Sequence, residues 1–296
     1  MESSILTQIF LPLALFIIML GMGLSLVLND FRRVVQHPKA TLLGLSNQLL
    51  LLPLVGFLLA QAFALPGELA VGLMLLAACP GGVTSNLISH LANGDTALSI
   101  TLTAISSLIT IITIPIVVNY SMLHFLAQDE QIAVDVVQMI LQIAVITVIP
   151  VAIGMYIRSR NEKFARKMER PVKIVSAVFL ALIIVAAVIK DRDNLLTSLQ
   201  LAGPAALALN VTTMGLGYLS ARLLRLSTPQ SVTVSIESGI QNGTLAIGIA
   251  LGILENGTIS IPPAIYSLLM FATGGAMIAF FGRKRSEEVK FQPPLK

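Results

Sequence analysis

A series of long apolar runs, each bounded by charged residues or by Pro and Gly, constrains this chain more than any other feature. A helix of about 20 apolar residues crosses a hydrocarbon core of ~30 Å, and most of the runs reach that length. We therefore predict an all-α membrane protein with nine transmembrane helices. The predicted spans are residues 9–28, 40–62, 69–91, 96–118, 132–157, 171–189, 198–221, 229–254 and 260–281.

Composition agrees with a membrane protein, because only 11% of the residues are charged, against ~25% in soluble domains. The pI is about 9.4, but the basic residues fall between apolar runs, so we expect no nucleic-acid partner. The single cysteine, Cys79, excludes an intramolecular disulfide and is expected to be a small apolar filler. Residues Met1–Gln8 lack the basic region of a cleaved signal peptide, so we expect the first run to remain as an anchor.

The basic residues predict an orientation. With nine spans, 17 of the 19 Lys and Arg residues fall on one side, and only Lys190 and Arg192 fall on the other. By the positive-inside rule, the N-terminus lies outside and the C-terminus in the cytoplasm of a cell (inner) membrane. The loop from Arg158 to Lys173 carries seven basic residues and reads as an orientation determinant, or alternatively as a site for lipid headgroups. No segment is long enough for a separate soluble domain, and no obligate protein partner is evident.

Of the fifteen acidic residues, fourteen fall at span ends, in loops or near the termini, and only Glu237 lies deep inside a predicted span. An ionisable group there costs at least ~2.5 kcal/mol, so Glu237 is a candidate functional residue. No basic residue lies at a matching depth, which leaves protonation or a bound cation to neutralise the carboxylate. Gln241 lies on the same helix face, and Gly239 and Gly243 weaken the helix and free carbonyl oxygens. Carboxylate, amide and carbonyl oxygens suit a hard cation.

The third span carries a comparable interruption, from Cys79 to Asn86. Pro80 removes a helix donor, and the two glycines that follow make a continuous helix unfavourable. We predict that a half-helix restarts near Gly82 or Val83, with unpaired first amides at its positive dipole end.

Further polar residues accompany this break. Ser99 and Thr103 lie on one face of the fourth span, and Asn47 and Gln48 precede an irregularity expected at Pro53 in the second. The third and eighth spans run in opposite directions, and each is interrupted at a corresponding place in its half. This pattern is typical of an inverted-repeat secondary transporter, with the fifth span unpaired.

At these residues the chain resembles the bile acid:sodium symporter family. The motifs are PGG-x-x-SN at Pro80–Asn86, E-x-G-x-Q-N at Glu237–Asn242, Gly94–Ser99 and Gly21–Leu24. The resemblance implies the bacterial nine-helix type, a single transporter domain with a core of residues 40–118 and 198–281 and a panel of residues 9–28 and 132–189. The two broken helices would cross at two sodium sites.

The resemblance also implies ligands, carried over position by position. The first sodium ion would be held by Ser85, Asn86, Ser99, Thr103 and Glu237. The second would be held by Gln48, Glu237 and Gln241 with the backbone of Ser238 and Ile240. Thr84 and Asn242 are candidate substrate contacts.

Charge then predicts the kind of substrate. One carboxylate with two sodium ions leaves the site near +1, and the restarted half-helix adds a partial positive end. This favours an organic anion, bile-acid-like or smaller, carried by alternating access. A proton-coupled carrier in which Glu237 titrates is the alternative. An intramembrane enzyme is disfavoured, because the spans contain no paired aspartates, no Ser-His pair at membrane depth and no HExxH helix.

Overall fold

The computed structural model describes residues 11–126, 135–190 and 195–290, and within them the chain is helical and contains no strand. The all-α prediction is confirmed for this part of the chain. Residues 9, 10 and 132–134, which begin two predicted spans, lie outside it. The helices are α1 Leu11–Ser25, α2 Leu28–Arg32, η2 Arg33–Val35, α3 Pro38–Ser46, η3 Asn47–Leu51, α4 Leu52–Ala62, α5 Gly67–Ala78, α6 Val83–Leu91, α7 Thr96–Phe125, α8 Val136–Arg160, α9 Glu162–Lys190, α10 Leu195–Leu223, α11 Thr228–Gly239, α12 Gly243–Gly252, η4 Thr258–Ser260 and α13 Ile261–Lys290.

Four helical segments of the described part are long and apolar enough to cross a membrane, and six are when each bent pair counts as one span. The four are Pro38–Ala62, Thr96–Phe125, Val136–Arg160 and Thr258–Gly282. The bent pairs are α1 with α2 and η2, at 72°, and α5 with α6, at 63°. The chain is therefore a multi-pass membrane protein, while the count of nine spans stays a prediction.

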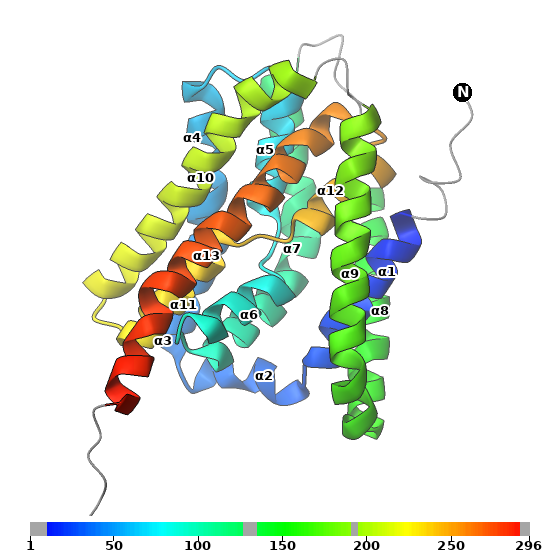
Figure 1. Cartoon of the computed structure of the whole chain (residues 1–296). Helices are drawn as coiled ribbons and strands as arrows, with labels where there is room; N and C mark the ends of the chain where they lie inside the picture. The colour runs from blue at the N-terminus through cyan, green and yellow to red at the C-terminus, as the bar shows by residue number, and fades with distance from the viewer. Residues whose placement is uncertain (1–10, 127–134, 191–194, 291–296) are drawn as a thin grey trace, which may run out of the picture.

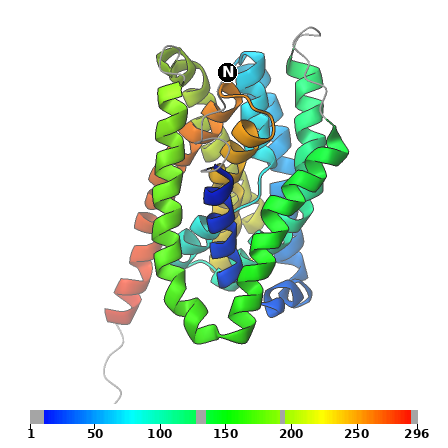
Figure 2. The same cartoon turned by 90° about the vertical axis from the view of Figure 1, so that its right-hand side faces the viewer.

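Helices α1, α8 and α9 pack side by side along one flank of the molecule (Figures 1 and 2). Glycine permits a close approach there: a Cβ on Gly23 would collide with the backbone of Val151, and a Cβ on Gly154 with that of Leu20. Small residues at a helix contact allow backbones to approach closely in membranes. The opposite flank holds α10, which packs against α11, α13 and α4.

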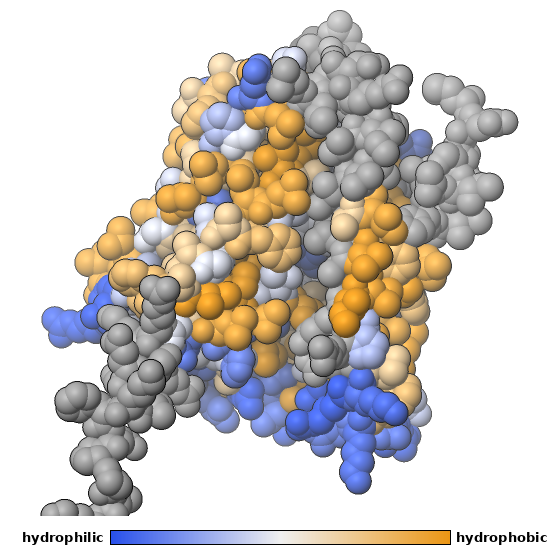
Figure 3. Space-filling model, viewed as in Figure 1, coloured by the Kyte–Doolittle hydropathy of each residue, from blue (hydrophilic) through white to orange (hydrophobic). Residues whose placement is uncertain are grey.

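The visible surface carries an apolar belt, with hydrophilic side chains gathered at the end where α2 lies and α8 turns into α9 (Figure 3). Large apolar side chains along the belt are exposed, for example Leu50, Leu54 and Leu58 on the second predicted span. Exposure of this kind is the expected surface of a protein solvated by lipid.

Side-chain caps explain where several helices begin. Asp95 accepts a hydrogen bond from the amide of Leu98 at 3.0 Å and caps the beginning of α7. Asn242 accepts one from the amide of Leu245 at 3.1 Å and begins α12.

Cys79 is 1% exposed and packs in the main apolar cluster, so the expected filler role is confirmed.

The two interrupted helices meet at their breaks. Helix α5 ends at Ala78 and α6 restarts at Val83, as predicted, while α11 ends at Gly239 and α12 begins at Gly243. The amide of Asn242 donates to the carbonyl of Pro80 at 2.8 Å, so the two connecting segments are hydrogen-bonded to each other. In Figure 1 they lie near the middle of the molecule, between the helix halves.

The second predicted span is also irregular, because residues Asn47–Leu51 form a π-helical turn before Pro53. Proline has no amide proton to donate to the preceding turn, and a wider turn accommodates that loss. The expected irregularity is confirmed, and it lies at Gln48.

Candidate functional site

The Glu237 carboxylate, 1% exposed, lies between α11, α6 and α7. Its Oε1 lies 2.5 Å from Ser99 Oγ, and its Oε2 lies 3.1 Å from Thr103 Oγ1. The same two hydroxyls lie 2.8 Å and 3.2 Å from Asn86 Oδ1, and Ser85 Oγ lies 3.5 Å from Thr103 Oγ1. The structure thus brings together all five residues predicted for the first sodium site. We call them the carboxylate cluster.

Acceptors outnumber protons in the carboxylate cluster. Ser99 and Thr103 each have one hydroxyl proton, and each lies between a carboxylate oxygen of Glu237 and the amide oxygen of Asn86. A hydroxyl has one donor and two acceptor lone pairs, so these contacts leave lone pairs without hydrogens. An oxygen cluster of this composition suits a hard monovalent cation or an additional proton.

A second group of oxygens lies beside the backbone of Glu237. The side-chain amides of Gln48 and Gln241 donate to its carbonyl at 3.3 and 3.1 Å, and Gln241 also donates to the carbonyl of Ser238 at 3.1 Å. Ile240 is the C-cap of α11, in the connection to α12, so its carbonyl lies outside the regular helical hydrogen-bond ladder. We call Gln48, Gln241 and these three carbonyls the amide cluster.

The amide cluster contains two buried acceptors without partners. Oε1 of Gln48 and Oε1 of Gln241 are both buried and accept no hydrogen bond within the described residues. Buried amide oxygens almost always have a partner, so the pair indicates a missing ligand. Oxygen and nitrogen of an amide are exchanged by a half-turn of the side chain, which would direct both oxygens at a cation beside the carbonyls. The residues therefore fit the predicted second ion.

Gly81 lies where the two clusters meet. A Cβ at this position would be 2.5 Å from Glu237 Oε2, 3.1 Å from Gln48 Nε2 and 3.2 Å from Ser85 Oγ. Any larger residue would enter the space between the carboxylate and the amide, so the second residue of the PGG motif is fixed by packing.

Two residues that the sequence analysis did not single out hold the break of α11. The carbonyl of Gly239 accepts hydrogen bonds from Asn210 Nδ2 at 2.7 Å and from the Tyr266 hydroxyl at 2.8 Å. These side chains come from α10 and α13 and are fully buried. They hold the carbonyl of Gly239, whose two neighbours in the sequence, Ser238 and Ile240, contribute their carbonyls to the amide cluster. An Asn inside an apolar run was the available signal, because a buried amide needs a partner.

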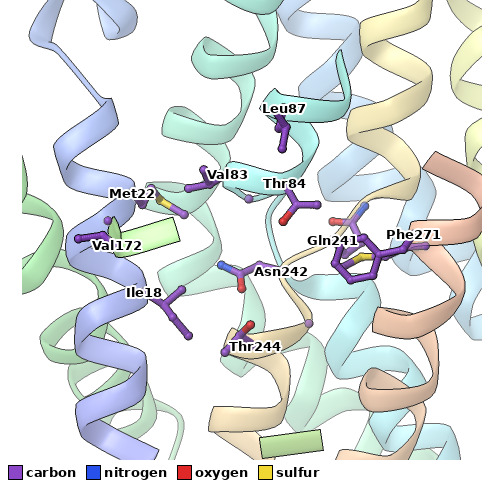
Figure 4. A pocket seen from close by; sticks show the side chains of 14 residues that line it. Ile18, Met22, Val83, Thr84, Leu87, Val172, Gln241, Asn242, Thr244 and Phe271 are labelled. Atoms are coloured by element: carbon purple, nitrogen blue, oxygen red, sulfur yellow. The ribbon is translucent and has the colours of Figure 1, made fainter. Parts of the chain in front are cut away.

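A cavity of about 240 Å³ adjoins both breaks. Its walls come from α1, α6, α9, α13 and the α11–α12 connection, and Figure 4 shows Ile18, Met22, Thr84, Asn242 and Phe271 around it. Both candidate substrate contacts thus line this cavity. Gln241 lines it too, and the same side chain bonds the Glu237 carbonyl.

An all-helical, multi-pass membrane protein whose broken helices meet beside a buried carboxylate belongs to the class of membrane transporters. Comparison with known sequences identifies the family of transporters. The model of the sodium bile acid symporter family matches residues 12–198, and the chain belongs to that family.

Relatives carry similar descriptions. The chain is 32% identical over 276 residues to the uncharacterized sodium-dependent transporter YocS of Bacillus subtilis, covering 93% of this chain and 84% of that protein. It is 27% identical to the probable sodium/metabolite cotransporter BASS1, chloroplastic, of Arabidopsis thaliana, covering 93% and 67%. It is 32% identical to human sodium/bile acid cotransporter 4, covering 97% and 67%. These findings confirm the family resemblance that the sequence motifs indicated.

Proposed function

We propose that the protein is a symporter that uses a sodium gradient to carry a small organic anion, with two sodium ions per cycle. The observation that carries this proposal is the Glu237 carboxylate, buried among neutral oxygen donors, with no Lys or Arg side chain among its hydrogen-bond or ion-pair partners in the described residues. A carboxylate in that position needs a cation that the protein does not supply. The carboxylate cluster would hold one ion, and the amide cluster the other.

The cavity supports an anionic substrate of modest size. Helices α6 and α12 both begin at its wall, and the first amides of a helix form a partial positive charge that attracts anions. The Asn242 amide oxygen caps α12, which leaves its NH₂ group as a donor for a carboxylate beside Thr84. A volume of about 240 Å³ lies below the ~300–1,000 Å³ typical of drug-sized ligands, so a carboxylate smaller than a bile acid fits best.

Coupling between ion binding and substrate binding would follow from residues that the ion clusters and the cavity share. Gln241 lines the cavity and belongs to the amide cluster, and Glu237 contributes to both clusters. Ions bound there would hold the two broken helices in the arrangement that forms the cavity wall. In alternating access, the core of residues 40–118 and 198–281 would move against the panel of residues 9–28 and 132–189. The N-terminus would lie outside the cell and the C-terminus in the cytoplasm.

Replacing the carboxylate tests the proposal without knowledge of the substrate. An ion that binds only the folded protein raises its melting temperature as its concentration rises. We expect sodium chloride to stabilise the purified wild-type protein relative to potassium chloride, and Glu237→Gln to abolish the difference. Glu255→Gln, at an exposed position, is the matched control and should respond like wild type. Equal stabilisation of Glu237→Gln and wild type would contradict the proposed sites.

Uptake into proteoliposomes then separates sodium coupling from the proton-coupled alternative. A panel of labelled carboxylates, from short 2-oxo acids to bile acids, is tested under a sodium gradient and, separately, under a pH gradient in sodium-free medium. We expect uptake only with sodium. Uptake driven by the pH gradient alone would contradict sodium coupling and favour the proton-coupled alternative, in which Glu237 titrates.

A further inference from the structure

A second cavity, of about 340 Å³, shares only the lining residue Met22 with the cavity beside the two breaks, which we call the substrate cavity after its proposed role. Its walls come from α1, α2, α7 and α8, so it separates two helices of the predicted panel from one of the predicted core. The proposed transport cycle assigns it no role. We call it the α7–α8 crevice.

The α7–α8 crevice is apolar and opens toward the lipid-facing surface. Among the residues that line it, Leu108 on α7 is 48% exposed and Val148 on α8 is 38% exposed. Along α8 the lining runs from Thr147 to Met155, about 12 Å at 1.5 Å per residue. That length is close to one leaflet of a ~30 Å hydrocarbon core. An opening of this size and polarity in a bilayer is filled by an acyl chain rather than by water.

Positive charge lies at one end of the crevice. Arg158 follows Met155 by three residues on α8, and its Nη1 donates at 2.8 Å to the carbonyl of Leu24, between the lining residues Met22 and Leu26. The Nε of Arg158 is buried and has no hydrogen-bond partner within the described residues. A buried guanidinium N–H without an acceptor is costly, so the protein compensates the charge of Arg158 only in part.

A second cation lies close by. Arg32 is exposed on α2 and follows Phe31, which lines the crevice. The neighbouring basic residues are engaged elsewhere: Arg33 pairs with Asp30 at 3.0 Å, and Arg160 lies over the Tyr156 ring. Arginine binds phosphate through several N–H groups at once.

We propose that the α7–α8 crevice is a binding site for one anionic phospholipid, whose acyl chain fills the crevice and whose phosphate is bound by Arg158 and Arg32. A zwitterionic lipid would supply the chain but add a cationic group beside the two arginines. Free phosphate would lack the chain.

Native mass spectrometry of the purified full-length protein tests this site, with added phosphatidylglycerol, phosphatidylcholine of the same chains, or inorganic phosphate. We expect a phosphatidylglycerol adduct that survives detergent washing, a weaker phosphatidylcholine adduct and no phosphate adduct. Ala152→Trp fills the crevice and Arg158→Gln removes the charge, and each should lower phosphatidylglycerol affinity by about fivefold or more.

Matched controls come from the same helix. Ile153→Trp adds the same bulk outside the crevice, and Arg160→Gln removes a charge outside it. Both should bind phosphatidylglycerol like wild type. Should Ala152→Trp fail to fold, Arg158→Gln with Arg32→Gln decides the question alone. Equal affinity of wild type and this double variant, or an adduct formed equally with phosphatidylcholine, would overturn the proposal.

Discussion

At the scale of single residues, the site depends on one carboxylate and on the absence of a side chain next to it. Glu237 contributes its carboxylate to one cluster and its carbonyl to the other. Gly81 leaves the space between them open. The sequence pointed to Glu237 because hydrocarbon excludes charge. For Gly81, the sequence indicated only that a glycine breaks the helix. The close approach of Gly81 to Glu237 joins residues 156 positions apart, so the sequence alone did not reveal it.

Gly81→Ala should therefore remove sodium binding while the fold persists. The added methyl group would lie 2.5 Å from Glu237 Oε2, so the carboxylate must move away from the hydroxyls of Ser99 and Thr103. We expect sodium to stop raising the melting temperature. Gly203→Ala, where a Cβ meets nothing within 4 Å, is the control and should keep the full sodium response. A sodium response in Gly81→Ala equal to that of wild type would show that the space is not used.

At the scale of elements, the breaks were predictable and their supports were not. Pro80 with two glycines stops a helix by local chemistry, and α6 begins at Val83 as expected. Ser99 and Thr103 share a helix face by simple periodicity. Asn210 and Tyr266, in contrast, reach the Gly239 carbonyl from two other helices. Contacts between distant helices follow from packing, which a single sequence does not specify.

Tyr266→Phe tests whether this support serves ion binding. It removes the hydroxyl at 2.8 Å from the Gly239 carbonyl and leaves the ring in the core. A lost hydrogen bond of about 1 kcal/mol at the break would raise the sodium concentration for half-maximal stabilisation about fivefold. Tyr218→Phe on α10, where the ring packs against that of Phe281, is the control. If Tyr266→Phe lowers the melting temperature equally in sodium and in potassium, the hydroxyl supports the fold alone.

At the scale of the whole molecule, the apolar runs indicate a membrane protein and the basic residues predict an orientation for it, but neither indicates its cavities. The substrate cavity is lined by five separate parts of the chain, from Ile18 to Phe271. Its shape depends on how α1 and α9 lie against α6 and α13. Residues such as Ile18 and Met22 look like ordinary lipid-facing or core positions in the sequence, so their place beside Thr84 and Asn242 emerged only from the fold.

Relative movement of core and panel is the remaining step, and crosslinking across the substrate cavity tests it. Ile18 on α1 and Thr244 on α12 both line the cavity, one from each proposed body. The native Cys79 is 1% exposed, so cysteines introduced at these positions would react selectively. We expect a short bis-maleimide that links Ile18→Cys to Thr244→Cys to stop uptake. The substrate for this measurement is a labelled carboxylate that the wild-type protein carries into proteoliposomes.

The control joins two helices within the core. A Cβ on Gly56 would lie 3.0 Å from that of Ala77, so Gly56→Cys with Ala77→Cys brings two thiols together between α4 and α5. A link inside one rigid body restrains no relative movement, so uptake should continue. If crosslinking across the cavity leaves uptake unchanged, the two groups of helices do not move against each other in transport. If both crosslinks stop it, the core itself must deform, and the division into core and panel is wrong.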